Sequence, residues 1–207
     1  MARPWSRLEH SLLLLDGYLH PRFGTRSLPE LAEDVKNVPE GYDVTGRSYV
    51  AQRLLLLPNL MLPRADLEAY DDNIKRHLDV INRSRPVAER VVLKYFQQLA
   101  LLYTEHVLHR FFLDRSAFLA DLNAIVAQWN QSIRAETDRF PAVSANDLTK
   151  LAYWMATGSG KTLLLHINYH QFLHYSTLAG GRRLNSILLI TPNTGLSDQH
   201  LEEFAKS

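Results

Sequence analysis

A run of small residues followed by lysine and threonine constrains this chain more than any other feature. It lies between the apolar stretch 151–156 and a helical pattern, and it reads Thr157-Gly158-Ser159-Gly160-Lys161-Thr162. Small residues let backbone N–H groups turn towards phosphate oxygens, because no bulky side chain blocks the approach. Strand, loop and helix in this order are the context that a phosphate-binding loop requires. The sequence therefore predicts such a loop at these residues.

Each polar group of the predicted loop has an expected role. Lys161 is expected to reach the β- and γ-phosphates of a nucleotide, and the Thr162 hydroxyl to ligate Mg²⁺. The helix N-terminus adds partial positive charge. The full pattern G-x-x-x-x-G-K-[ST] is not met, because Met155 stands at its first position. The alternative interpretation is a glycine-rich turn that happens to precede a helix, although a lysine in the first turn is mildly unfavourable beside the helix dipole.

Composition sets wide limits on the class of protein. A chain of 207 residues with 46% hydrophobic and 22% charged residues is expected to fold into one or two globular domains. The net charge of +1 predicts no general affinity for nucleic acid or membranes, so any nucleic-acid contact must come from a local site. The sequence contains no cysteine, which excludes disulfides and thiolate metal sites. No apolar run approaches the roughly 18 residues of a spanning helix, and the expected compartment is the cytoplasm.

Hydrophobic spacing predicts a mostly helical first part of the chain. Apolar positions three and four residues apart favour helices over residues 1–20, 28–35, 66–83, 86–112 and 116–133. Asp66 is a candidate N-cap, Pro86 a candidate first helical residue, and residues 49–57 a strand or short helix. The polar segment 134–147 is interpreted as a boundary. The expected division is a helical and loop region at 1–85, a helical region at 86–147 and a nucleotide-binding part at 148–207.

The last part of the chain predicts the beginning of a parallel sheet. The helix after the loop should end at Gly180-Gly181, and the near-continuous apolar run at 186–191 is typical of a buried parallel strand. With the stretch 151–156 it would form one right-handed βαβ unit. The predicted fold class is α/β, with a helical N-terminal region followed by the incomplete start of a P-loop parallel sheet.

The loop Met155–Thr162, followed about thirty residues later by Ile-Leu-Leu-Ile-Thr-Pro-Asn, resembles the first two motifs of superfamily 2 helicases. The resemblance is greatest to the restriction-enzyme branch, the R subunits of type III and type I systems and related DEAD/DEAH-type proteins, and it covers residues 148–207. In that family methionine commonly stands at the first loop position. The resemblance implies a RecA-like ATP-binding domain, ATP and Mg²⁺ as cofactors, and duplex DNA as a partner. It also implies modification or specificity subunits as possible partners.

Residue roles follow from the resemblance position by position. The family's motif I falls on Ala156, Thr157, Gly158, Ser159, Gly160, Lys161 and Thr162 as the nucleotide site, with Thr162 holding Mg²⁺. Motif Ia falls on Thr191, Pro192, Asn193 and Gln199, where the family grips the nucleic-acid backbone without reading sequence. An N-capped helix entry is the alternative interpretation of motif Ia.

Two further sets of residues are weighed as candidates. Gln97 or its neighbour Gln98 resembles the adenine-reading glutamine of such enzymes, against the alternative of an ordinary polar position on an amphipathic helix. His106 and His109 with Glu105, and the histidines at 166, 170 and 174, show spacings compatible with metal binding. The first set has no clear further partner and the second has no accompanying acid, so both are interpreted as structural or surface residues.

The expected protein is an ATP-hydrolysing helicase or translocase. Because no apolar run ending in Asp-Glu follows residue 199, this chain is expected to be the N-terminal segment of a longer motor, inactive alone. Two alternatives stay open: a P-loop NTPase that is not a helicase, and a helical interaction module with a non-catalytic nucleotide site.

Overall fold

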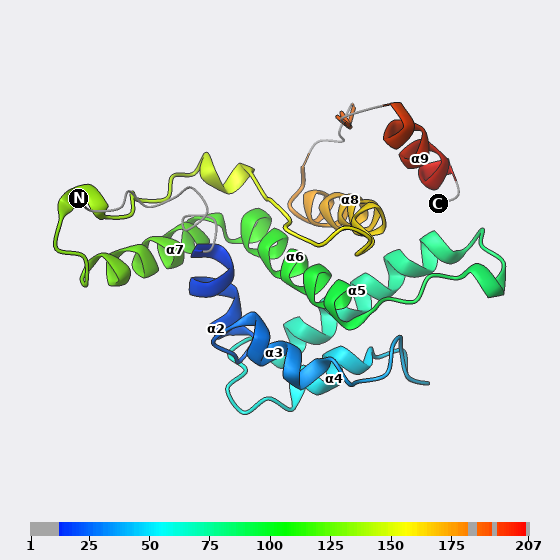
Figure 1. The fold of residues 1–207 in the computed structure, drawn as a ribbon, viewed down its shortest axis with the longest axis horizontal. Coiled ribbons are helices and arrows are strands. Elements are labelled where there is room, and N and C mark those ends of the chain that lie inside the picture. The colour runs from blue at the N-terminus through cyan, green and yellow to red at the C-terminus, as the bar shows by residue number, and fades with distance from the viewer. Residues whose placement is uncertain (1–12, 182–185, 192–193, 206–207) are drawn as a thin grey trace.

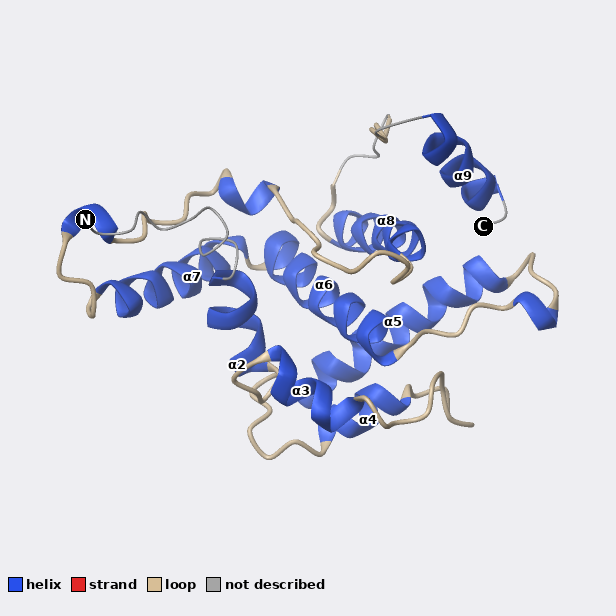
Figure 2. Ribbon diagram, viewed as in Figure 1, coloured by secondary structure: helices blue, strands red, loops and turns tan. Residues whose placement is uncertain are grey.

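The computed structural model describes residues 13–181, 186–191 and 194–205, and these residues form helices joined by loops (Figures 1 and 2). The long helices are α5, α6, α7 and α8, with bounds Arg64–Asn82, Tyr95–Leu113, Arg115–Asn130 and Lys161–Leu178. Shorter elements precede them: a π-helix at Leu13–Leu19, α2 at His20–Arg22, α3 at Leu28–Val35 and α4 at Tyr49–Leu55. Single 3₁₀ turns lie at Val87–Glu89, Glu136–Asp138 and Asp147–Thr149, and α9 spans Thr194–Ala205.

The predicted α/β class is wrong for the described part of the chain. No strand forms there, and the only β-bridge found in it joins Tyr42 and Ser48. Residues 151–156 and 186–191 are not helical but have no neighbouring strand, and Trp154, Leu188 and Ile190 are each more than 80% exposed. A strand satisfies its backbone groups only through a partner strand, so an apolar run without a partner does not become one. The predicted βαβ unit and RecA-like sheet are therefore absent from the described residues.

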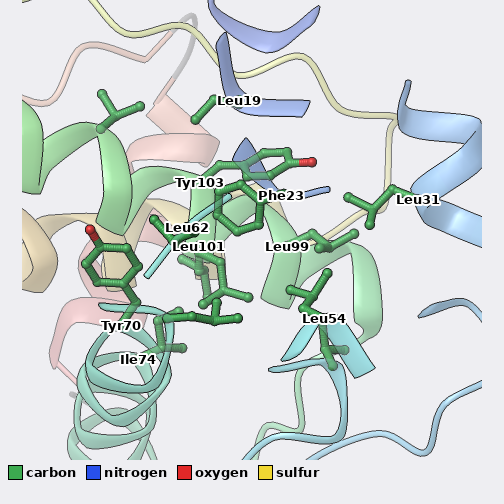
Figure 3. Close-up of a cluster of buried hydrophobic side chains, with 14 of the residues drawn as sticks. Leu19, Phe23, Leu31, Leu54, Leu62, Tyr70, Ile74, Leu99, Leu101 and Tyr103 are labelled. Atoms are coloured by element: carbon green, nitrogen blue, oxygen red, sulfur yellow. The ribbon is translucent and has the colours of Figure 1, made fainter. Parts of the chain in front are cut away.

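Helix α6 lies at the centre of the main core and contacts α5, α7 and α8 (Figure 1). Leu99, Leu101 and Leu102 of α6 are almost fully buried. Figure 3 shows the first two of these among side chains from α4 and α5, including Leu54 and Ile74. The same core extends from Tyr18 to Ile167, so it takes side chains from all three predicted segments. Helix α8, which follows the small-residue loop, is thus anchored in the helical body.

Several helix boundaries follow from local signals. Helix α3 has the predicted bounds, because the Ser27 side chain accepts a hydrogen bond from the Glu30 N–H and caps it. Helix α5 ends at Asn82 as expected, but it begins at Arg64, so Asp66 lies in its first turn and is not the N-cap. The segment 49–57 resolves into helix α4 rather than a strand. The aromatic side chains of Tyr103 in α6 and Phe118 in α7 are buried.

Helix α6 starts nine residues later than predicted, at Tyr95 instead of Pro86. The Asn82 side chain explains the delay, since its amide nitrogen donates to the Val91 carbonyl at 2.9 Å and its oxygen accepts from the Val91 N–H at 2.8 Å. Both backbone groups of Val91 are used by these bonds and are unavailable to a helix ladder. The contact between Asn82 and Val91 therefore prevents the helix start that Pro86 predicts.

Ser48 joins α4 to α5, and we expect Ser48→Ala to lower the free energy of unfolding by about 1–2 kcal/mol. Its hydroxyl accepts from the Ala51 N–H at 3.0 Å, which caps α4, and donates to the buried carboxylate of Asp71. The alanine variant loses the cap and one donor to Asp71. Urea unfolding of the variant and the parent measures the difference, and an unchanged midpoint would contradict the assigned capping role.

In the described part of the chain, no helix is both long enough and apolar enough to cross a membrane.

Candidate functional site

The small-residue loop has the backbone conformation that its glycines permit. Gly158 and Gly160 have φ values of +77° and +83°, in the left-handed region where other residues are strained. The Ser159 N–H donates to the Ala156 carbonyl at 3.3 Å and closes a turn. The chain then enters α8 directly at Lys161.

The N-terminus of α8 carries no side-chain cap and no acidic residue in its first turn. Gly160 is the N-cap, and its carbonyl accepts from the Leu164 N–H at 3.1 Å. The first N–H groups of a helix have no intrahelical acceptor and must be satisfied by a cap, by water or by a ligand. Such an end, preceded by glycines with positive φ, is suited to an anion.

The Lys161 side chain folds back over the loop. Its ammonium donates to the carbonyls of Ala156 at 2.8 Å and Met155 at 3.2 Å, while the residue stays exposed to solvent. The charge of Lys161 thus lies beside the loop, and its predicted contact with phosphate stays a prediction. A bound phosphate would have to draw the ammonium from two neutral carbonyls, and a charged acceptor makes the stronger hydrogen bond. Thr162, the predicted Mg²⁺ ligand, follows on the first turn and is half-buried.

Gln97 contacts the loop across 62 residues of sequence. Its side-chain nitrogen donates to the Ser159 carbonyl at 2.9 Å, and its side-chain oxygen accepts from the Lys94 N–H at 2.9 Å. The structure therefore brings this predicted residue to the loop. Its predicted contact with adenine stays a prediction, since the bonds it makes here are to backbone.

A buried carboxyl group holds α8 against α5 and α6. Glu105 of α6 is fully buried and accepts hydrogen bonds from the side chains of Asn73 (2.8 Å), Gln171 (2.7 Å) and Tyr175 (2.6 Å). Burial raises the pKa of Glu105 from 4.5 to about 7, against the lowering effect of these hydrogen bonds. From the sequence, Glu105 is considered only beside His106 and His109 and this network is not predicted, although a glutamate inside an otherwise apolar helix pattern is a usable signal.

The residues predicted to grip nucleic acid are only partly described. Thr191 shares a hydrogen bond with the Ser197 hydroxyl at the entry to α9. Pro192 and Asn193 lie outside the described residues, and Gln199 belongs to α9 with its backbone alone described. Helix α9 reaches α8 through Phe204, whose ring centre lies 3.8 Å from that of His166. The nucleic-acid role of these residues stays a prediction.

The histidines form aromatic contacts. Tyr18 stacks on the buried His106, and His77 of α5 stacks on His170 beside His174. Burial lowers the pKa of His77 and of His106 to about 3, which keeps both rings neutral. Among residues 13–181, 186–191 and 194–205, no group of three or more His, Asp or Glu side chains is arranged to hold a metal ion.

No protein-family model matches the chain, and comparisons with curated proteins and with solved structures gave no match either.

Proposed function

We propose that residues 156–162 bind the phosphates of ATP together with Mg²⁺. The observation that supports this most is the combination of two left-handed glycines, an uncapped α8 and the Lys161 ammonium beside the loop. A cluster of N–H donors with a lysine is the arrangement by which proteins cradle phosphate oxygens. No carboxylate lies in the first turn to compete with the anion.

Each polar group of the loop would make a different contact with the bound nucleotide. The N–H groups at the start of α8 would face phosphate oxygens, and Lys161 would exchange its two carbonyl partners for a phosphate oxygen. Thr162 would hold Mg²⁺ through its hydroxyl. When bound, Mg²⁺ neutralises phosphate charge and orients the group for transfer.

The wider proposal is an ATP-driven DNA helicase or translocase that resembles the R subunit of a type III restriction endonuclease. It rests on the motif resemblance at residues 156–162 and 191–199. In this proposal Thr191 and Gln199 contact the backbone of duplex DNA, modification or specificity subunits are further partners, and the protein acts in the cytoplasm. A P-loop NTPase that is not a helicase is the second candidate, because the phosphate loop at 156–162 is common to both classes and only residues 191–199 point to a helicase.

Replacing Lys161 with alanine is expected to weaken the binding of Mg-ATP by at least about tenfold, since hydrogen bonds to charged groups contribute about 1.5–3 kcal/mol. Isothermal titration of the parent and the variant measures the change. Lys150→Ala is the matched control, because Lys150 is also exposed and lies outside the loop. Equal affinity of the Lys161 variant and the parent would sink the proposal.

The effect of duplex DNA on ATP hydrolysis distinguishes the two candidate functions. Stimulation of ATP hydrolysis by duplex DNA in the parent, lost in Lys161→Ala, supports a motor. Hydrolysis that needs Lys161 but does not respond to duplex or single-stranded DNA favours the second candidate.

A further inference from the structure

The carboxamide of Gln97 is fixed at both ends. Gln97 is the third residue of α6 and is 7% exposed. Its oxygen must face the Lys94 N–H, because that backbone group is a donor, and its nitrogen must face the Ser159 carbonyl, because that group is an acceptor. These two partners define one orientation of the amide, so a carboxylate or a flipped amide cannot satisfy both.

The same side chain also lies against the backbone of Gly160. A Cβ built on Gly160 would overlap the side-chain nitrogen of Gln97, so the loop and the carboxamide are in direct contact. Gly160 is the N-cap of α8 and its carbonyl accepts the Leu164 N–H. A shift of Gly160 would therefore also shift the first turn of α8, where Lys161 and Thr162 lie.

From these contacts we infer that Gln97 is a positioning residue, which holds Ser159 and Gly160 in the shape that receives phosphate whatever base the nucleotide carries. The inference builds on the proposed phosphate site. It differs from the role implied by the family resemblance, in which the glutamine reads adenine. The two roles differ in what they predict for a ligand that has no base.

Inorganic tripolyphosphate with Mg²⁺ is that ligand. In Gln97→Glu a carboxylate oxygen faces the Ser159 carbonyl, and two acceptors repel each other. We expect this variant to bind Mg-ATP and Mg-tripolyphosphate about tenfold more weakly than the parent, by the same factor for both. Gln97→Met, which keeps the length of the side chain without its polar atoms, is expected to lose about threefold for both. Gln128→Glu, an exposed position of α7, is the matched control and should leave both affinities unchanged.

Amide hydrogen exchange gives a readout that does not depend on ligand. In Gln97→Glu we expect faster exchange over residues 157–164, with unchanged exchange in α7 and an unchanged overall helix content. Weaker binding of Mg-ATP alone would show that Gln97 reads the base and would overturn the inference, as would unchanged affinity for both ligands. If the parent binds neither ligand, the proposed phosphate site fails. In that case, unchanged exchange over residues 157–164 in Gln97→Glu would also reject the positioning role of Gln97. Faster exchange there would show that Gln97 still determines the shape of the loop.

Discussion

Replacing Glu105 with alanine is expected to lower the free energy of unfolding by about 3–5 kcal/mol at pH 6. The substitution removes the shared acceptor of Asn73, Gln171 and Tyr175, and each of these donors is at most 4% exposed. Each buried group left without a partner costs about 1–3 kcal/mol, and the cavity adds to that. Because the donors come from α5 and α8, the loss falls on the contact that anchors the loop-bearing helix.

Chemical denaturation followed by circular dichroism measures the effect. Glu33→Ala is the control, since Glu33 of α3 is exposed and its ion pair in the described residues is with Lys36, just after that helix. Its effect should stay within about 0.5 kcal/mol. A Glu105→Ala variant as stable as the parent would mean that the network contributes nothing to the packing of α8.

The sequence predicts elements well where the signal is local. The bounds of α3 and the end of α5 follow from caps and hydrophobic spacing, and the turn before α8 follows from two glycines and a lysine. These features depend on residues within a few positions of one another. A local pattern is therefore enough to predict them, although Gln97 also contacts the turn before α8 across 62 residues of sequence.

Predictions fail where a distant group decides the structure. Asn82 holds Val91 out of a helix and delays α6, and Asp71 fixes Ser48 at the start of α4. The near-continuous apolar run at 186–191 predicts a strand, whereas a strand also requires a neighbouring strand to pair with. For the site, motif reasoning named Gln97 but could not place it on Ser159, because that contact depends on how α6 and α8 pack.

Glu105 should make the stability of the protein depend on pH, and the sign of this dependence is opposite to that of an ordinary paired carboxylate. The pKa of Glu105 is 4.5 in the unfolded chain and about 7 in the folded protein, because burial disfavours the charged form. Between these values the folded state binds more protons than the unfolded state, so stability falls as pH rises. The contribution is fully present below pH 4.5 and is lost as pH rises through about 7.

The buried histidines act in the opposite direction and must be separated from this effect. The pKa values of His77 and His106 are lowered to about 3, so the folded state binds fewer protons and their contribution to stability rises between about pH 3 and 6.5. Glu105→Gln keeps these histidines and removes only the carboxyl titration. It places an amide near the side-chain oxygens of Asn73 and Gln171, which have no hydrogen-bond partner in the described structure.

We therefore compare the unfolding free energy of Glu105→Gln with that of the parent at two pH values. Relative to the parent, the variant should become more stable by about 2–3 kcal/mol between pH 5 and pH 8. Urea unfolding of both proteins at the two pH values gives this difference, in which the histidine contributions cancel. If the difference stays constant, Glu105 titrates at its ordinary pKa, and α8 is held by a carboxylate that stays charged throughout this range.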